Sequence, residues 1–171
     1  MMMLQGKSAF TRKELDSIAD NLATDEAGGQ SALNPFALVL KPHRNVITGN
    51  YDANVLIAAL NSRGKEVVWF DRRKGINGLF LEVAGYGGRL LGIIANVPKP
   101  WLLGWWQGRH WVAIRKLEGT WYNLDSNKAV PVAFADEEMD LREFFETLLA
   151  NDSEIMLVLN EVAGAATQGK D

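Results

Sequence analysis

The chain has 171 residues, 47% of them hydrophobic and 23% charged, a balance that fits one globular domain with a single core. A net charge of −3 without a stripe of Lys or Arg argues against a nucleic acid or a membrane surface as partner. The complete absence of cysteine excludes disulfides, zinc–thiolate sites and a thiol nucleophile from these residues.

The first predicted element is a helix that starts near Thr11. Thr11 and Glu14 have the spacing of a capping box, and Leu15, Ile18, Ala19 and Leu22 follow at helical spacing. From Ala23 to Gly49 the pattern weakens, and we expect a mobile arm or loop there. His43 lies in that arm without other ligands at suitable spacing, so no metal site and no cofactor are predicted.

In the middle of the chain, the sequence pattern predicts a helix and two strands. Asp52 has the position of an N-cap, and Gly64 that of a helix stop. Strands are predicted over Glu66 to Phe70 and Arg89 to Asn96, separated by a solvated turn at Asp71 to Lys74.

The last third predicts a hairpin, a helix and a final strand. The helix has Asp136 as its N-cap and runs to about Ala150, and the strand covers Glu154 to Leu159. We expect a single α+β domain over residues 1–162, with helices on an antiparallel or mixed sheet of about five strands. Residues 163–171 are predicted to be a disordered tail.

The hairpin covers Arg109 to Ser126, with Glu118-Gly119 as its turn. A two-residue loop pairs Leu117 with Thr120, and this register places His110 diagonal to Asp125 on one face of the sheet. A four-residue loop keeps that register, whereas an odd-length loop sends one of the two side chains to the other face.

A histidine held by a carboxylate is the base and orienting half of a nucleophilic triad. His110 and Asp125 are therefore candidate catalytic residues. The alternative is a satisfied polar pair on a mostly apolar sheet, without chemistry.

Aromatic residues gather directly before this histidine, in the segment from Pro98 to Gly108. Trp111, on the predicted strand, is assigned to the core because Trp is usually well buried. For the loop residues, core packing and the apolar wall of a binding groove both remain open. The substrate-binding candidates are Trp101, Trp105, Trp106 and Arg109.

Three blocks of the sequence, together well over half of it, resemble the Josephin family of thiol-dependent deubiquitinating enzymes, in its short single-domain form. They run from Leu4 to Leu22, from Asn34 to Arg73 and from Gly108 to Ser126. The resemblance implies a papain-like cysteine-protease fold and ubiquitin or its conjugates as partner. A cytoplasmic or nuclear location is expected because no stretch has the length of a membrane span and no basic region precedes an apolar run at the N-terminus. We also expect a monomer. It also implies that His110 is the catalytic base and Asp125 its orienting residue.

The nucleophilic cysteine of that family has no counterpart in this chain. In the family it belongs to a Cys-x-x-His-x-Leu-Asn-Asn segment, preceded by a Gln, directly upstream of the block that matches Leu4-Gln5-Gly6. Met1 to Met3 stand there instead. The resemblance thus implies a Josephin domain shortened at its N-terminus and inactive as printed. The other reading is a binding module: a non-catalytic pseudoenzyme or a truncated isoform that retains ubiquitin contacts.

Overall fold

The computed structural model describes residues 10–27, 51–100 and 107–161, and it divides into two compact units. One unit is Leu4–Arg63, and the other is Gly64–Asp171 together with Met1–Met3. The predicted tail and His43 lie outside the described residues, as does the segment from residue 28 to 50. None of the helices in the described ranges is both long and apolar enough to cross a membrane.

The smaller unit contains two helices, α1 (Arg12–Ala27) and α2 (Ala53–Asn61). The predicted capping box is present, since the Thr11 amide donates to the Glu14 carboxylate at 2.7 Å and the Glu14 amide donates to the Thr11 hydroxyl at 3.2 Å. The helix continues past Ala23, so the loop predicted from that position is wrong for residues 23–27. The reason is that its last turn is polar and therefore lacks the apolar repeat on which the prediction relied.

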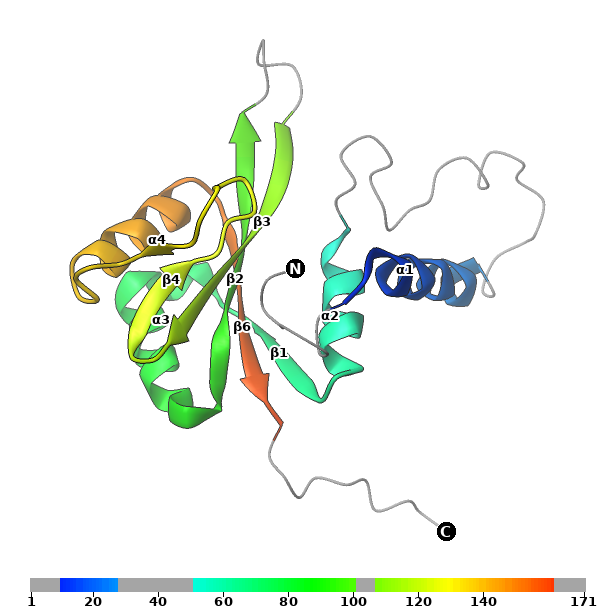
Figure 1. The fold of residues 1–171 in the computed structure, drawn as a ribbon, viewed down its shortest axis with the longest axis horizontal. Coiled ribbons are helices and arrows are strands. Elements are labelled where there is room, and N and C mark those ends of the chain that lie inside the picture. Colours follow the sequence, from blue (N-terminus) through cyan, green and yellow to red (C-terminus); the bar gives the residue numbers. More distant parts are fainter. Residues whose placement is uncertain (1–9, 28–50, 101–106, 162–171) are drawn as a thin grey trace. The chain divides into compact units, whose positions relative to one another are not determined.

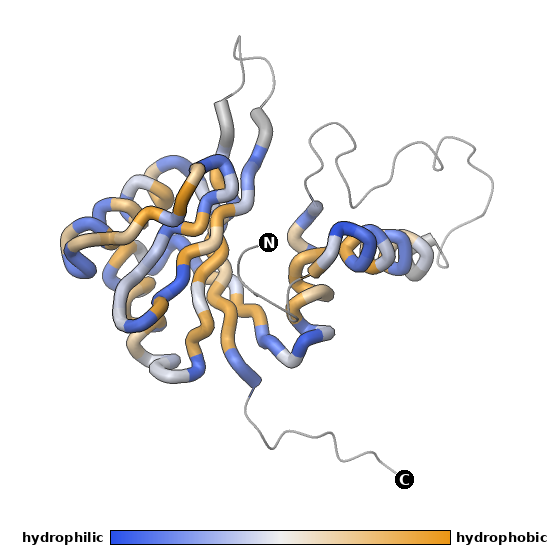
Figure 2. The backbone as a smooth tube through the Cα atoms, in the orientation of Figure 1, coloured by the Kyte–Doolittle hydropathy of each residue, from blue (hydrophilic) through white to orange (hydrophobic). Residues whose placement is uncertain are grey.

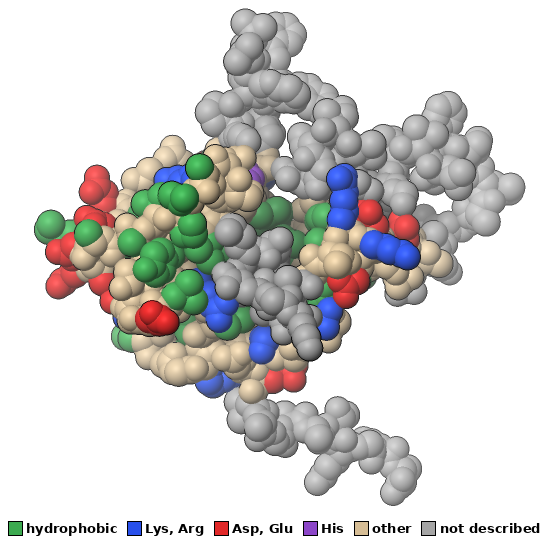
Figure 3. All heavy atoms as spheres, in the orientation of Figure 1, with side chains coloured by type: hydrophobic (Ala, Val, Ile, Leu, Met, Phe, Trp, Pro, Cys, Tyr) green, Lys and Arg blue, Asp and Glu red, His purple; other side chains and the backbone are tan. Residues whose placement is uncertain are grey.

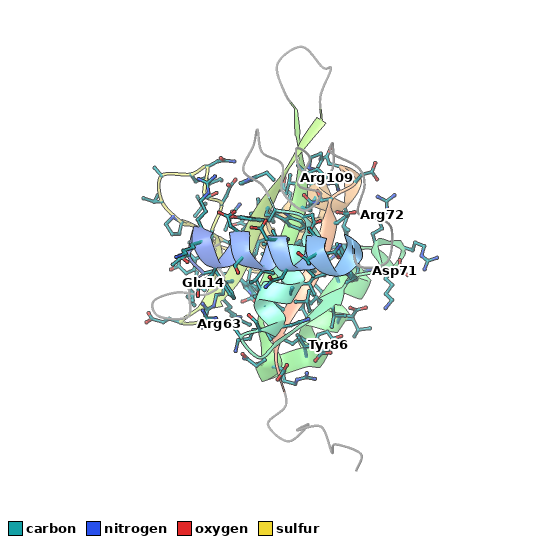
Figure 4. The ribbon with its side chains drawn as sticks, turned by 90° about the vertical axis from the view of Figure 1, so that its right-hand side faces the viewer. Glu14, Arg63, Asp71, Arg72, Tyr86 and Arg109 are labelled. Atoms are coloured by element: carbon teal, nitrogen blue, oxygen red, sulfur yellow. The ribbon has the colours of Figure 1, made fainter. Side chains whose placement is uncertain are left out.

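The second helix begins as the sequence predicts. The Asp52 carboxylate accepts the Val55 amide at 3.0 Å, and Gly64 has the positive φ of a residue that follows a helix end. Arg63 follows α2 in the sequence. Its guanidinium lies 2.9 Å from the carboxylate of Glu14 and over the ring of Phe10, so Arg63 connects the end of α2 to the start of α1 (Figure 4).

The larger unit is built on an antiparallel sheet of six strands in the order β1-β6-β2-β3-β4-β5. About five strands were predicted, and the additional one is the two-residue β5. Register pairs connect all six strands. The strands are β1 (Lys65–Trp69), β2 (Leu90–Pro100), β3 (Gln107–Leu117), β4 (Thr120–Asn123), β5 (Val132–Ala133) and β6 (Glu154–Asn160).

The central strands are apolar along much of their length, as the orange stretches of Figure 2 show. All residues from Ile155 to Leu159 in β6 are buried, and so are Ile93, Ile94 and Ala95 in β2. Continuous burial along a strand, in place of alternation, is typical of a strand with both faces covered. This buried sheet supports the residues of the site, which lie on β3 and directly after β4.

Two helices, α3 (Gly75–Tyr86) and α4 (Asp140–Ala150), lie on one face of this sheet (Figure 1). They close a core that includes Leu79, Leu141 and Phe145, each at most 2% exposed. The sequence did not predict α3. The predicted α4 is present but starts later, because the Asp136 carboxylate accepts the amides of Glu138 and Met139 in a preceding turn. Two 3-10 turns, η2 (Arg72–Lys74) and η3 (Gly87–Arg89), flank α3.

Strand β2 is longer than predicted and reaches into the supposed loop. Pro98 pairs with Arg109, and Pro100 pairs with Gln107. The prediction ended the strand at Asn96 because proline cannot donate to a ladder. Prolines are tolerated here because the pairing of β2 with β6 stops at Asn96 and Glu154, which leaves β2 with one neighbour beyond that point.

Candidate active site

The site is positioned by the turn between β3 and β4. Glu118 and Gly119 both have positive φ, 49° and 87°, as a type I′ hairpin turn requires. Leu117 pairs with Thr120 and Ile114 with Asn123, which is the predicted register. Beyond β4 the ladder is prolonged by the Leu124 amide, which donates to the Ala113 carbonyl at 2.8 Å.

This register brings His110 and Asp125 together. Nε2 of His110 lies 2.6 Å from Oδ1 of Asp125, and the two side chains are 15% and 17% exposed. His110 is on β3, where it pairs with Val97 of β2, and Asp125 follows the end of β4. Figure 3 shows only a small purple area, the colour of histidine, on the face in view. The contact predicted from the hairpin register is therefore present, in a partly desolvated position.

The carboxyl group of Asp125 is kept ionised by its neighbours. Burial raises its pKa, but the Asn127 amide, the His110 ring and the charge of Lys128 together outweigh burial, so the pKa lies below its ordinary value. The Asn127 amide donates to the same Oδ1 atom at 2.8 Å. A carboxylate fixed in this way stabilises a positive charge on the imidazole that it contacts.

The contact also decides which ring nitrogen is available for chemistry. A carboxylate on Nε2 favours the tautomer that carries its proton there, and the lone pair is then on Nδ1. Among the described residues, no hydrogen bond to Nδ1 of His110 occurs. The pair can therefore accept a proton at Nδ1 and return it, which is general acid–base chemistry.

Two Asx turns shape the segment that carries Asp125, and the sequence reasoning missed both. Oδ1 of Asn123 accepts the amide of Asp125 at 3.0 Å, and Oδ1 of Asp125 accepts the backbone amide of Asn127 at 2.8 Å. In each, a short side-chain oxygen binds the amide two residues ahead. The spacing Asn-x-Asp at positions 123 and 125 was the available signal, because Asn and Asp are the residues whose side chains form such turns.

The substrate-binding candidates are only partly within the described residues. Trp101, Trp105 and Trp106 lie outside them. The Arg109 guanidinium donates to the backbone carbonyls of Asp152 and Asn96, at 2.9 and 3.4 Å, and lies 3.7 Å from the Glu154 carboxylate. Arg109, labelled in Figure 4, therefore has intramolecular contacts of its own.

The core assignment of Trp111 is only partly met, since this residue is of intermediate exposure. It pairs with the buried Asn96 across β2 and β3, close to where the pairing of β2 with β6 ends. Trp111 thus lies near the open end of the sheet, where fewer neighbours can cover it.

Within the ranges that the structure describes, no three His, Cys, Asp or Glu side chains gather in a way that could hold a metal ion. His110 and Asp125 are the ionisable pair in contact at this site. A histidine held by a carboxylate can act as a base with its orienting group.

A comparison of the whole chain with known protein families identifies its family. The Josephin family model matches residues 2–159, which is most of the chain. The chain belongs to the Josephin family. It is similar to a Josephin-like protein of Arabidopsis thaliana, with 45% identity over 150 residues. It is 38% identical over 165 residues to a Josephin-like protein of Drosophila melanogaster, and 37% identical over 158 residues to human Josephin-2.

The matches cover most of this chain but a smaller share of each relative's own length. They take in 88%, 93% and 89% of this Josephin chain, but 40% of the Arabidopsis protein, 66% of the Drosophila protein and 74% of human Josephin-2. The membership agrees with the α+β class of the fold. The chain spans less than half of the Arabidopsis relative and about two thirds of the Drosophila one.

Proposed function

We propose that this chain supplies the base and the orienting carboxylate of a cysteine-type deubiquitinase that cleaves after the C-terminal glycine of ubiquitin. His110 is the base and Asp125 holds it. The observation that carries the proposal is the 2.6 Å contact between Nε2 and the carboxylate, in a chain that belongs to the Josephin family. Ubiquitin or a ubiquitin conjugate is the proposed partner.

The proposed chemistry needs a thiol that these 171 residues do not contain. In the proposed reaction, Nδ1 of His110 takes the proton of a cysteine thiol, and the thiolate attacks the carbonyl carbon after the terminal glycine. The imidazolium then protonates the leaving amine as the C–N bond breaks, which gives a thioester. A water molecule, deprotonated by His110, hydrolyses the thioester and releases ubiquitin and the thiol.

The chain as printed is accordingly expected to be inactive. The test is hydrolysis of a fluorogenic conjugate at the C-terminus of ubiquitin, compared with a His110→Ala control. Turnover above that control would contradict the proposal, because another nucleophile would then have to act.

The positive test restores a nucleophile. A Gln followed by the family's Cys-x-x-His-x-Leu-Asn-Asn segment, joined before Leu4, should give a chain that cleaves ubiquitin conjugates. Cleavage should be lost in its Cys→Ala, His110→Ala and Asp125→Ala variants, and the Cys→Ala variant should still bind ubiquitin. An extended chain that is folded, binds ubiquitin and does not cleave it would contradict the enzyme assignment.

The second candidate function is a ubiquitin-binding module without catalysis, and the absence of cysteine from the chain favours it. In that case the His110–Asp125 contact is structural. A direct binding measurement with ubiquitin separates the two: the pseudoenzyme binds ubiquitin both as printed and in the extended form, and neither form turns over a conjugate.

A further inference from the structure

The side chain of Asn123 is the starting observation. Asn123 is the last residue of β4 and is only 6% exposed, which is unusual for an amide side chain. It is fixed on both sides by the sheet, since it pairs with Ile114 of β3 and with Val132 of β5. Its Oδ1 is directed along the chain and accepts the Asp125 amide at 3.0 Å.

The backbone of Asp125 is held on both of its polar groups. Its amide is bound by Asn123, and its carbonyl accepts the Lys128 amide at 3.0 Å. Only the first of these bonds comes from the sheet, because Lys128 belongs to the same turn as Asp125. The direction in which Asp125 leaves the end of β4 is therefore set by two bonds, that of the Leu124 amide to the Ala113 carbonyl and that of the Asp125 amide to the Asn123 side chain.

That direction matters because a single carboxylate oxygen performs two tasks. Oδ1 of Asp125 contacts Nε2 of His110 at 2.6 Å and accepts the Asn127 amide at 2.8 Å. A shift of the Asp125 backbone would lengthen both distances at once, and hydrogen bonds weaken steeply outside their preferred geometry. Apart from His110 itself, this oxygen is placed by the backbone of its own turn, through Asp125 and Asn127.

We infer that Asn123 is a positioning residue, which orients the Asp125 carboxylate on His110 through the buried hydrogen bond from the Asp125 amide to the Asn123 side chain. The inference deepens the proposed function and rests on it only in treating His110 as the base. Among the described residues, no hydrogen bond joins the Asn123 side chain to the imidazole, so its proposed effect on the base passes through Asp125.

The direct readout is the tautomer of His110. In a His43→Gln background His110 is the only histidine, and the ¹⁵N shifts of its ring, at a pH where imidazole is neutral, report the ratio of the Nε2–H to the Nδ1–H form. Asn123→Leu keeps the branching and the number of side-chain heavy atoms but removes the acceptor, and we expect this ratio to fall by about fivefold, the effect of losing one ordinary hydrogen bond. Asn123→Asp restores an acceptor and should restore the ratio.

A matched control separates positioning from mere destabilisation. Ile114→Val weakens the same point of the sheet, because Ile114 is fully buried and pairs with Asn123, but leaves the acceptor in place. It should lower the melting temperature without changing the tautomer ratio. An Asn123→Leu chain that is folded and has the native ratio would overturn the inference.

A measurement on the unaltered chain covers the case in which Asn123→Leu does not fold. The Asp125 amide lies beyond the last strand residue, yet it should exchange with solvent at least about tenfold more slowly than an open amide, because it is bound to Asn123. Exchange at the rate of an open amide would overturn the inference.

The failure of this inference is distinguishable from the failure of the proposed function. If the extended chain does not cleave ubiquitin while the tautomer ratio changes as expected, the proposed function is wrong and the positioning role stands. If the extended chain cleaves, and Asn123→Leu changes neither its kcat nor the tautomer ratio, the positioning role is wrong.

Discussion

Leu117 and Thr120 face each other across the two-residue turn, and this pairing decides on which face of the sheet each later residue of the hairpin lies. A slip of one position would move Asp125 to the other face, away from His110. The turn is therefore as important for the site as the two residues that meet there, although it lies at the opposite end of the strands.

The first prediction concerns the turn. Glu118 adopts a left-handed conformation with φ of 49°, which disfavours ordinary side chains by about 1 kcal/mol, whereas Asn tolerates it. Glu118→Asn should therefore increase the free energy of unfolding by about 0.5–1 kcal/mol, which raises the melting temperature by about 1–4 °C. Thermal and urea denaturation measure the change.

Gly119→Ala provides the comparison of opposite sign. Its φ of 87° is unfavourable for alanine, and an added Cβ would have nothing within 4 Å, so strain of the backbone would be the only effect. The variant should be less stable than the native chain. Equal stability of all three chains would contradict the type I′ turn.

A second prediction concerns Glu137, which ties the segment before α4 to the hairpin. Its carboxylate accepts the Trp121 indole N–H at 2.9 Å and lies 2.7 Å from the ammonium of Lys116. The Lys116 ammonium holds the pKa of Glu137 below its usual value despite partial burial, and the Trp121 N–H adds to this. Trp121 is 4% exposed, so its N–H has little access to water.

Glu137→Ala should therefore cost about 1–2 kcal/mol of stability, because it leaves a buried donor without a partner. Glu137→Gln retains an acceptor for the indole and should cost less. Lys116→Ala removes a surface ion pair and a long contact of the ammonium with the Trp121 ring, 6.0 Å from its centroid, and should cost about 0–1 kcal/mol. Urea denaturation ranks the three, and a larger loss from Lys116→Ala than from Glu137→Ala would refute this account.

The third prediction is a pH dependence that follows from Asp125. Its pKa is lower in the folded chain than in the unfolded chain, where it is about 3.9. A lowered carboxyl pKa contributes stability that is complete above the unfolded pKa and is lost as pH falls through the folded pKa. The stability difference between the native chain and Asp125→Asn should thus be largest near neutral pH and shrink below about pH 4.

Urea denaturation of both chains at a series of pH values gives this difference. A difference that stays constant between neutral and strongly acidic pH would show that the Asp125 carboxylate gains nothing from its neighbours on folding.

Local signals predicted much of the fold correctly. The capping box at Thr11 and the N-cap at Asp52 depend on neighbours in sequence, and both have the expected hydrogen bonds. The hairpin register also followed from a local signal, the Glu118-Gly119 turn. His110 and Asp125 could be brought together from the sequence because both lie within reach of that one turn.

Features that depend on distant or weak signals were missed. Helix α3 contains Gly75, Gly78 and Gly85, and glycine disfavours helix, so tertiary packing of residues such as Leu79 outweighs local propensity there. Strand β5 has two residues and no pattern of its own. The placement of β6 between β1 and β2 depends on pairing across the whole unit, which a single sequence does not reveal.

The last prediction separates two roles for Arg109. The sequence made it a substrate-binding candidate, whereas the structure places its guanidinium on the Asp152 carbonyl, at 2.9 Å, in the turn between α4 and β6. Arg109→Ala should lower the free energy of unfolding by about 1 kcal/mol, or the melting temperature by about 2–4 °C, mainly through the loss of that bond and also through the loss of the longer contacts to the Asn96 carbonyl and the Glu154 carboxylate. Arg73→Ala is the matched control, since Arg73 pairs with Asp71 on the surface two residues away, and it should change the melting temperature less.

Kinetics in the extended chain test whether Arg109 also contacts the substrate. Loss of a substrate contact made equally in the ground and transition states raises KM at constant kcat, whereas a misplaced His110 lowers kcat. We expect KM to rise, and an Arg109→Ala chain with native KM and native kcat would remove Arg109 from the proposed ubiquitin site.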